Sequence, residues 1–263
     1  RFDSAGGRMD TPDPPSRRAV LAAVAGVGGL YGGASVARGA LGLDAVTFTD
    51  QREITQQNGP TLRVEWVTLY NGERVGGTGF EDGSGDAPSG PAVNVSNLLP
   101  GDTGALVVRL TVPTGEPGPA EVTASLTLTG NAENDINEPE SKAGDTTTGE
   151  DGGELADALD TAVWYDRGAG GVDGLGTRNG QREPGEPLVA PNAEGSLREV
   201  TSALSDGVVL DPASGGPACL RPGESVSVAV GWSLASDTGN AVQSDSVAFD
   251  LLFTAERCSG GGQ

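Results

Sequence analysis

Apolar and polar residues alternate along several stretches of the chain, and strict alternation is typical of a half-buried β-strand. The clearest stretch covers residues 122–129, where Val, Ala and Leu take every second position and Thr or Ser the positions between. The same pattern recurs at residues 46–49, 62–66, 106–112, 226–234 and 247–253. Turn-forming residues separate these stretches, and no helical pattern alternates with them. The sequence therefore predicts an all-β protein built as a sandwich.

The middle of the chain departs from this alternation. The pattern there predicts a loop at 131–153, a short helix at 154–159, a strand at 161–165, a glycine-rich segment at 166–187 and a second short helix at 197–204. None of these segments has enough apolar residues to build a core. We therefore expect short helical insertions, including an acidic insertion at 130–160, within a single domain at 45–258. Residues 259–263 are expected to form a disordered tail.

The N-terminal part is typical of an export signal. Arg17 and Arg18 precede an uncharged run at residues 19–37 that is rich in Ala and Gly. A charged start, a short apolar run and small residues make a signal peptide, and the arginine pair favours twin-arginine export or a related pathway. We predict that residues 1–44 are an export segment, recognised by the export machinery and removed by signal peptidase. A retained membrane anchor is the alternative, because the run is just long enough to span a bilayer.

The composition is strongly acidic. Asp and Glu number 37 against 16 Lys and Arg, and the formal net charge is −21. Carboxylates hold water and ions, and concentrated salt screens their mutual repulsion, so we interpret the surface as halophilic. Nucleic acid is excluded as a partner because its phosphates require a basic face.

Histidine is absent from the sequence. This absence excludes a Ser-His-Asp triad, a Cys-His pair and an HExxH zinc site. Carboxylate pairs can perform acid–base hydrolysis, but nothing in the sequence selects one pair. We therefore expect that the protein is not an enzyme.

Two cysteines, Cys219 and Cys258, are the only ones in the chain. An even number of cysteines in an exported protein predicts a structural disulfide. A redox or metal-binding pair is the alternative, but their spacing is far from that of a CxxC motif.

The acidic insertion contains the only candidate metal ligands. Carboxylates of Asp135, Glu138 and Glu140 are candidates for calcium, which takes six to eight oxygen ligands, and Asp145, Glu150 and Asp151 could join them. The alternative is a solvated acidic loop without an ion, and no EF-hand spacing is present. We expect no other cofactor.

Short motifs follow one another in a fixed order behind the export segment. Residues 45–50 (AVTFTD) are similar to an A-x-F-x-D start, and residues 95–102 (VSNLLPGD) contain an N-L-x-P-G-D turn. A second turn of this kind lies at 220–224 (LRPGE), and residues 240–246 (NAVQSDS) are similar to an N-x-x-Q-x-D-S motif before a last strand. In this order the motifs resemble the TasA/camelysin family, which carries SipW-type signal peptides. Residues 154–166 are similar to its archaeal, bundling-pilus branch.

The resemblance implies a jelly-roll β-sandwich that is secreted to the cell surface. There it would assemble head to tail with other copies of itself into a fibre of a pilus or biofilm matrix. In such a fibre the N-terminal strand of one subunit completes a sheet of the next, which is donor-strand complementation. The candidate donor strand covers residues 45–54 and begins with Ala45, Val46, Thr47, Phe48, Thr49 and Asp50. An ordinary first strand, folded into its own domain, is the alternative.

Two other functions remain open at this point. One is a monomeric or membrane-tethered β-sandwich that serves as a cell-surface adhesion or binding module. The other is a camelysin-like peptidase, which the sequence disfavours because zinc sites use nitrogen or sulfur ligands in nearly every protein. The chain has no histidine to provide such nitrogen ligands.

Overall fold

The structure is a computed structural model, and it describes residues 47–56, 59–76, 78–83, 86–167, 179–211 and 218–258. The predicted export segment with Arg17 and Arg18, the residues Ala45 and Val46, and the predicted tail at 259–263 lie outside the described residues. Within the described ranges, no helix has the length and apolar character needed to cross a membrane.

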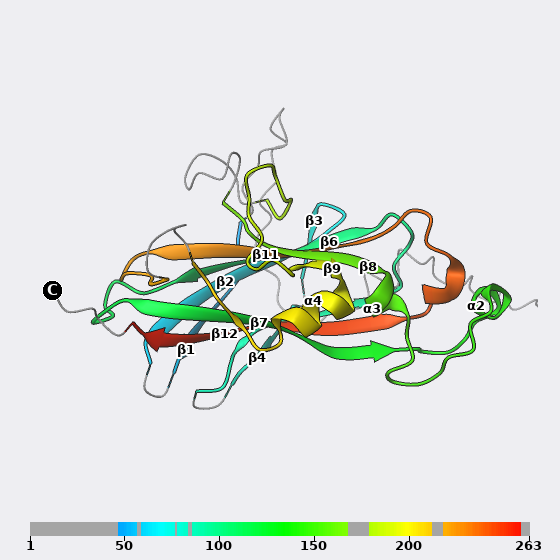
Figure 1. Cartoon of the computed structure of the whole chain (residues 1–263), viewed down its shortest axis with the longest axis horizontal. Helices are drawn as coiled ribbons and strands as arrows, with labels where there is room; N and C mark the ends of the chain where they lie inside the picture. Colours follow the sequence, from blue (N-terminus) through cyan, green and yellow to red (C-terminus); the bar gives the residue numbers. More distant parts are fainter. Residues whose placement is uncertain are drawn as a thin grey trace, which may run out of the picture.

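Two antiparallel sheets make up the described part of the chain (Figure 1). Sheet 1 contains β1 (Asp50–Thr55), β2 (Thr61–Tyr70), β3 (Glu73–Val75), β6 (Thr103–Thr111), β8 (Leu159–Tyr165), β9 (Glu194–Ser196) and β11 (Ser225–Leu234). Sheet 2 contains β4 (Gly79–Glu81), β5 (Gly90–Ser96), β7 (Ala120–Ala132), β10 (Val208–Val209) and β12 (Ser246–Arg257). The strand order is β1-β2-β6-β11-β8-β9 in sheet 1, where β3 also pairs with β2, and β10-β7-β12-β5-β4 in sheet 2.

The pairing of β5 to β12 is that of a jelly roll. The first strand of this set pairs with the last, β5 with β12, and the second with the last but one, β6 with β11. The two inner pairs follow the same rule, because β7 pairs with β10 and β8 with β9. One long antiparallel ribbon is thus rolled up into two facing sheets. The predicted jelly-roll β-sandwich is confirmed.

The core lies between the two sheets. Every second residue of β7 and β12 points into it, and the side chains of Leu126, Phe249 and Phe253 are fully buried. From sheet 1, Trp66 and Trp232 enter the same core. The alternation seen in the sequence therefore marks the side of each strand that faces the core.

Most of the predicted elements are confirmed by the structure. The strands predicted at 62–66, 106–112, 122–129, 161–165, 226–234 and 247–253 are β2, β6, β7, β8, β11 and β12. The two predicted helices are α3 (Leu155–Ala158) and α4 (Leu197–Leu204). Pattern alone did not predict β3, β4, β5, β9 and β10. Four of these strands are only two or three residues long, and the longer β5 begins with Gly90 and Pro91, which are typical of turns.

The prediction of a continuous loop at 131–153 is wrong. Strand β7 continues to Ala132, and a helix, α2 (Glu138–Ala143), forms within the acidic insertion. Asn137 caps this helix, and its side chain and that of Glu140 form a reciprocal capping box. Gly144 ends the helix with a φ of 93°, a conformation that suits glycine. Capping, and not an apolar face, therefore specifies this helix.

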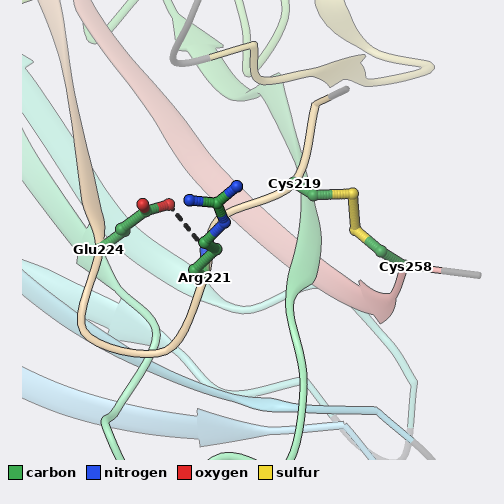
Figure 2. The surroundings of a disulfide bond; sticks show 4 residues. All are labelled: Cys219, Arg221, Glu224 and Cys258. Atoms are coloured by element: carbon green, nitrogen blue, oxygen red, sulfur yellow. Dashed lines mark hydrogen bonds between the residues drawn. A yellow bond between two sulfur atoms is a disulfide. The ribbon is translucent and has the colours of Figure 1, made fainter. Parts of the chain in front are cut away.

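The predicted disulfide between Cys219 and Cys258 is confirmed (Figure 2). It joins the segment before β11 to the residue that follows β12. Close by, the Glu224 carboxylate accepts a hydrogen bond from the Arg221 backbone N–H (2.8 Å), which braces the turn at Pro222 and Gly223. The disulfide therefore fixes one end of the sandwich covalently. At the other end of the sandwich lies α2 (Figure 1).

Candidate functional site

The first described strand, β1, lies at an edge of sheet 1. It pairs with β2 alone, in an antiparallel register that runs from Asp50 opposite Trp66 to Thr55 opposite Thr61. Of the predicted donor residues, Asp50 is the first of the strand, and Thr49 donates a backbone hydrogen bond to the Trp66 carbonyl (3.0 Å). The strand thus begins later than the predicted start at Ala45.

The inner side of β1 closes one side of the sandwich. Ile54 is the only residue of the strand that is buried. Arg52 reaches from β1 toward sheet 2, with its guanidinium 5.3 Å from the centre of the Phe80 ring and 3.4 Å from the Asp82 carboxylate. Most of the strand remains exposed to solvent. Its attachment therefore depends mainly on backbone pairing with β2.

Phe48 occupies the outer face of sheet 1 rather than the core side. Its ring lies under the Arg109 guanidinium, 4.6 Å away, and packs against a small apolar cluster on that face. The cluster consists of Val67, Leu69, Ala105, Val107, Trp164 and Ala229. Ile54 points to the opposite side, into the core. In a regular strand, residues six positions apart would lie on the same face, so the alternation of faces is interrupted between Phe48 and Asp50.

A second candidate site is a group of five carboxylates at the end of the sandwich where α2 lies. We call it the acidic cluster, and it consists of Glu133, Glu140, Asp145, Glu154 and Asp245. It contains two sets of three, one with Asp145 and Glu154 and one with Glu140 and Asp245, and Glu133 belongs to both. Within each set, one carboxylate oxygen per residue lies within 4.8 Å of the others.

Strand register explains why these distant residues meet. Ala132 at the end of β7 pairs with Ser246 at the start of β12, which places Glu133 beside Asp245. Helix α2 then returns the chain, so that Glu140 faces the same point, fully buried. The connection after Gly144 brings Asp145, and Glu154 precedes α3.

Backbone and hydroxyl donors hold most of these carboxylates in place. Asp245 accepts hydrogen bonds from the backbone N–H groups of Glu154 (2.6 Å) and Leu155 (2.9 Å), at the start of α3. Glu140 accepts from the N–H groups of Asn137 and Ser244, both at 2.6 Å, and from the Ser244 hydroxyl.

The outer carboxylates of the cluster are joined through Thr147. Its N–H donates to Asp145 (2.9 Å), and its hydroxyl lies 2.7 Å from Asp145 and 2.6 Å from Glu154. These bonds fix the directions of the carboxylates before any ligand is considered.

The electrostatics of the acidic cluster differ from one carboxyl to the next. Burial raises the pKa of Glu133 to about 7, and the neighbouring carboxylates of Asp245 and Glu140 act in the same direction. Burial also raises the pKa of Asp245. For Glu140, burial acts upward as well, but hydrogen bonds from Ser244 and Asn137 outweigh it and lower the pKa. The cluster therefore favours added positive charge at Glu133 and Asp245.

The structure divides the three calcium candidates predicted from the sequence. Glu140 lies in the acidic cluster. Glu138 points outward and pairs with Lys142 one turn along α2 (2.6 Å), with 79% of its side chain exposed. Asp135 is also exposed, and only its backbone takes part: its N–H donates to the Glu133 carboxylate (3.4 Å), and its carbonyl accepts from the Ser244 hydroxyl (2.7 Å). The high local content of acidic residues therefore identified the right segment, but only Glu140 of the three candidates lies in the acidic cluster.

Sequence reasoning named Asp145 as a possible additional ligand but missed Glu133, Glu154 and Asp245. Asp245 lies more than a hundred residues from Glu133 along the chain, and only the pairing of β7 with β12 brings them together. A signal for Asp245 was present in the motif at 240–246, where it precedes a strand. Neither spacing nor composition assigns it to a site.

Comparison with known proteins gives no relative for this chain. No family model matches it, and neither a curated protein nor a solved structure matches it significantly.

Proposed function

We propose that this chain is a secreted structural subunit of an extracellular fibre, in a pilus or biofilm matrix, that polymerises by exchange of its N-terminal strand. The observation that carries the proposal is the position of β1: it is the first described element, lies at a sheet edge and pairs with a single strand. Outside the cell, the signal-like residues 1–44 would have been removed, and the segment around β1 would be free to pair elsewhere.

The physical basis is that β1 can make the same contacts with the sheet of its own subunit and with the sheet of another copy. If β1 leaves, β2 presents a row of unpaired backbone N–H and C=O groups, which another strand can pair. The β1 strand of a second copy restores the backbone bonds, the burial of Ile54 and the contact of Arg52 with Phe80. Exchange therefore replaces each lost contact with an equal one between subunits.

Such an exchange does not close on itself. Each subunit gives its strand to one neighbour and receives a strand from another, so the contact is head to tail and builds an open filament. The strongly negative charge of −21 keeps filaments soluble until salt screens their repulsion. The order of motifs that resembles the TasA/camelysin family supports the same assembly. No catalytic step is part of this proposal.

A cysteine pair tests whether β1 is exchanged. Glu53 in β1 and Arg63 in β2 are directly opposite each other on the outer face, where Glu53 is exposed and Arg63 half-buried. Directly opposite residues lie about 4.5–5.5 Å apart, which suits a disulfide. In fibres of the Glu53→Cys/Arg63→Cys variant, we expect disulfides between chains and a ladder of oligomers on a non-reducing gel. The single variant Glu53→Cys, without a partner cysteine in the pair, is the matched control.

The opposite results are as informative. Fibres in which the introduced pair links only residues of the same chain would contradict strand exchange while leaving fibre formation intact. Dispersed monomers in electron micrographs of the secreted fraction would contradict the fibre itself and favour a monomeric or tethered surface module.

A further inference from the structure

Among the residues that the structure describes, the five carboxylates of the acidic cluster have no basic partner. No ion pair in the described part of the chain joins a Lys or Arg to any of them, and the single lysine, Lys142, pairs instead with the exposed Glu138. Carboxylates this close together repel each other strongly in a poorly hydrated site. A proton on Glu133, whose pKa is raised, compensates only one of these charges, so compensation of the others calls for a cation.

Unpartnered oxygens point to the position of that cation. Asp245 is completely buried, and its Oδ1 atom has no hydrogen-bond donor, although Oδ2 has two. Glu133 is 7% exposed and leaves Oε2 without a donor. The same is true of one buried oxygen each of Asp145 and Glu154. A buried ionised oxygen without a partner is costly, whereas a metal ion satisfies several of them at once.

We infer that the acidic cluster is a calcium site centred on the carboxylate of Glu133, the residue common to both sets. Its ligands would be drawn from the oxygens of Glu133, Glu140, Asp145, Glu154 and Asp245. The site offers only oxygen ligands, which suits a hard cation and disfavours zinc. Calcium binds oxygens at about 2.3–2.6 Å, so two ligands on opposite sides of one ion lie about 4.6–5.2 Å apart. The oxygens of each set lie within 4.8 Å of one another, close enough for one ion to contact all three residues. Magnesium needs shorter, near-octahedral contacts of about 2.0–2.1 Å and keeps several of its waters.

Bound calcium would connect four parts of the fold. Glu133 follows β7, Glu140 belongs to α2, Glu154 precedes α3, and Asp245 precedes β12. Calcium therefore acts as a cross-link at the end of the sandwich that lacks the disulfide. This role does not depend on strand exchange, because β1 makes no part of the site.

Calcium titration of the purified chain tests the site, after treatment with EDTA and in buffered salt. By calorimetry we expect saturable binding, a rise in Tm with calcium and a much smaller rise with magnesium at the same concentration. Metal analysis after gel filtration should give a constant number of calcium ions per chain.

Matched variants separate a specific site from general attraction to an acidic surface. Glu133→Gln should weaken calcium binding by at least about tenfold, since affinity follows the number of charged ligands. Glu138→Gln removes the same charge from an exposed position of α2 and should leave the affinity within about twofold. Asp145→Asn, at a less buried position, provides a second test should Glu133→Gln fail to fold.

Two results would overturn the inference. One is an absence of binding heat and of any Tm shift in the unmodified chain with millimolar calcium. The other is equal weakening by Glu138→Gln and by the variants of the acidic cluster, which would mean that calcium only screens the surface charge.

Discussion

The two ends of the sandwich are held together in different ways. At one end, the disulfide between Cys219 and Cys258 fixes the C-terminal end of β12 (Figure 2). At the other end, Asp245, just before β12, is held by backbone N–H groups and lies among carboxylates. The same strand is therefore anchored covalently at its end and electrostatically at its start.

This difference shows that each end depends on a different feature of the surroundings. The disulfide requires an oxidising compartment, and the proposed calcium site would require the cation in solution. We expect both conditions to be met outside a cell. A change in one condition should weaken one end and leave the other intact, which the following predictions exploit in order of size.

Removal of the disulfide should have the largest effect. The two cysteines are separated by 39 residues, and for a loop of this length the chain-entropy relation gives a stabilisation of about 4 kcal/mol. We expect Cys219→Ala/Cys258→Ala to lower the free energy of unfolding by about this amount in urea titrations. Calcium affinity should be unchanged. A loss below about 1 kcal/mol would mean that the hydrogen bonds between β7 and β12 already fix this end without the disulfide.

Replacement of Glu140 should have an intermediate effect. Glu140→Ala leaves the partly buried N–H groups of Asn137 and Ser244 without this acceptor, which costs about 1–3 kcal/mol in the free energy of unfolding. The measurement is urea titration in the presence of EDTA, so that calcium does not contribute. Glu138→Ala, in the same turn of α2 but exposed, is the control and should cost less than about 0.5 kcal/mol. Equal losses in both variants would contradict a structural role for the buried carboxylate.

The smallest effect is expected for the exposed ion pair of α2. Lys142 lies four residues after Glu138, and such pairs contribute about 0.2–0.5 kcal/mol to helix stability. Lys142→Ala should therefore change the free energy of unfolding by no more than this, and less in concentrated salt. A larger loss of stability would show that the charge of Lys142 compensates the negative charge of the acidic cluster at a distance. The end of the sandwich near α2 would then be stabilised in part by a basic residue of the chain itself.

Much of the fold can be predicted from the sequence because long strands repeat their pattern many times. Residues 122–129 show the alternation clearly, and the structure buries Val122, Ala124 and Leu126 and half-buries Leu128. Helix α2 escaped prediction because the side chain that it buries is the carboxylate of Glu140, which hydrophobic patterning does not detect. Its capping residues, Asn137 and Glu140, form the motif that would have revealed it.

The candidate sites were less predictable than the fold for a physical reason. The nearness of Glu133 to Asp245 follows from the register of β7 with β12, and register is a property of the folded sheet. The sequence favoured Glu138 as strongly as Glu140, since a helix turns one of two nearby carboxylates outward and the other inward only once it is packed. At the N-terminus, the alternation predicted that Phe48 belongs to the first strand. In the structure β1 begins at Asp50, and Phe48 packs on the outer face of sheet 1.

The rolled ribbon also determines when the protein can fold. Strand β12 lies between β7 and β5 in the middle of sheet 2, yet it is the last strand of the described chain. Pairings between residues so far apart in sequence form slowly, because the entropy of closing a long loop is lost before the new contacts can stabilise the structure. A chain that emerges from a ribosome or a translocation channel thus lacks the centre of sheet 2 until Arg257 is released. We therefore expect folding to be a late and slow event that follows the emergence of β12.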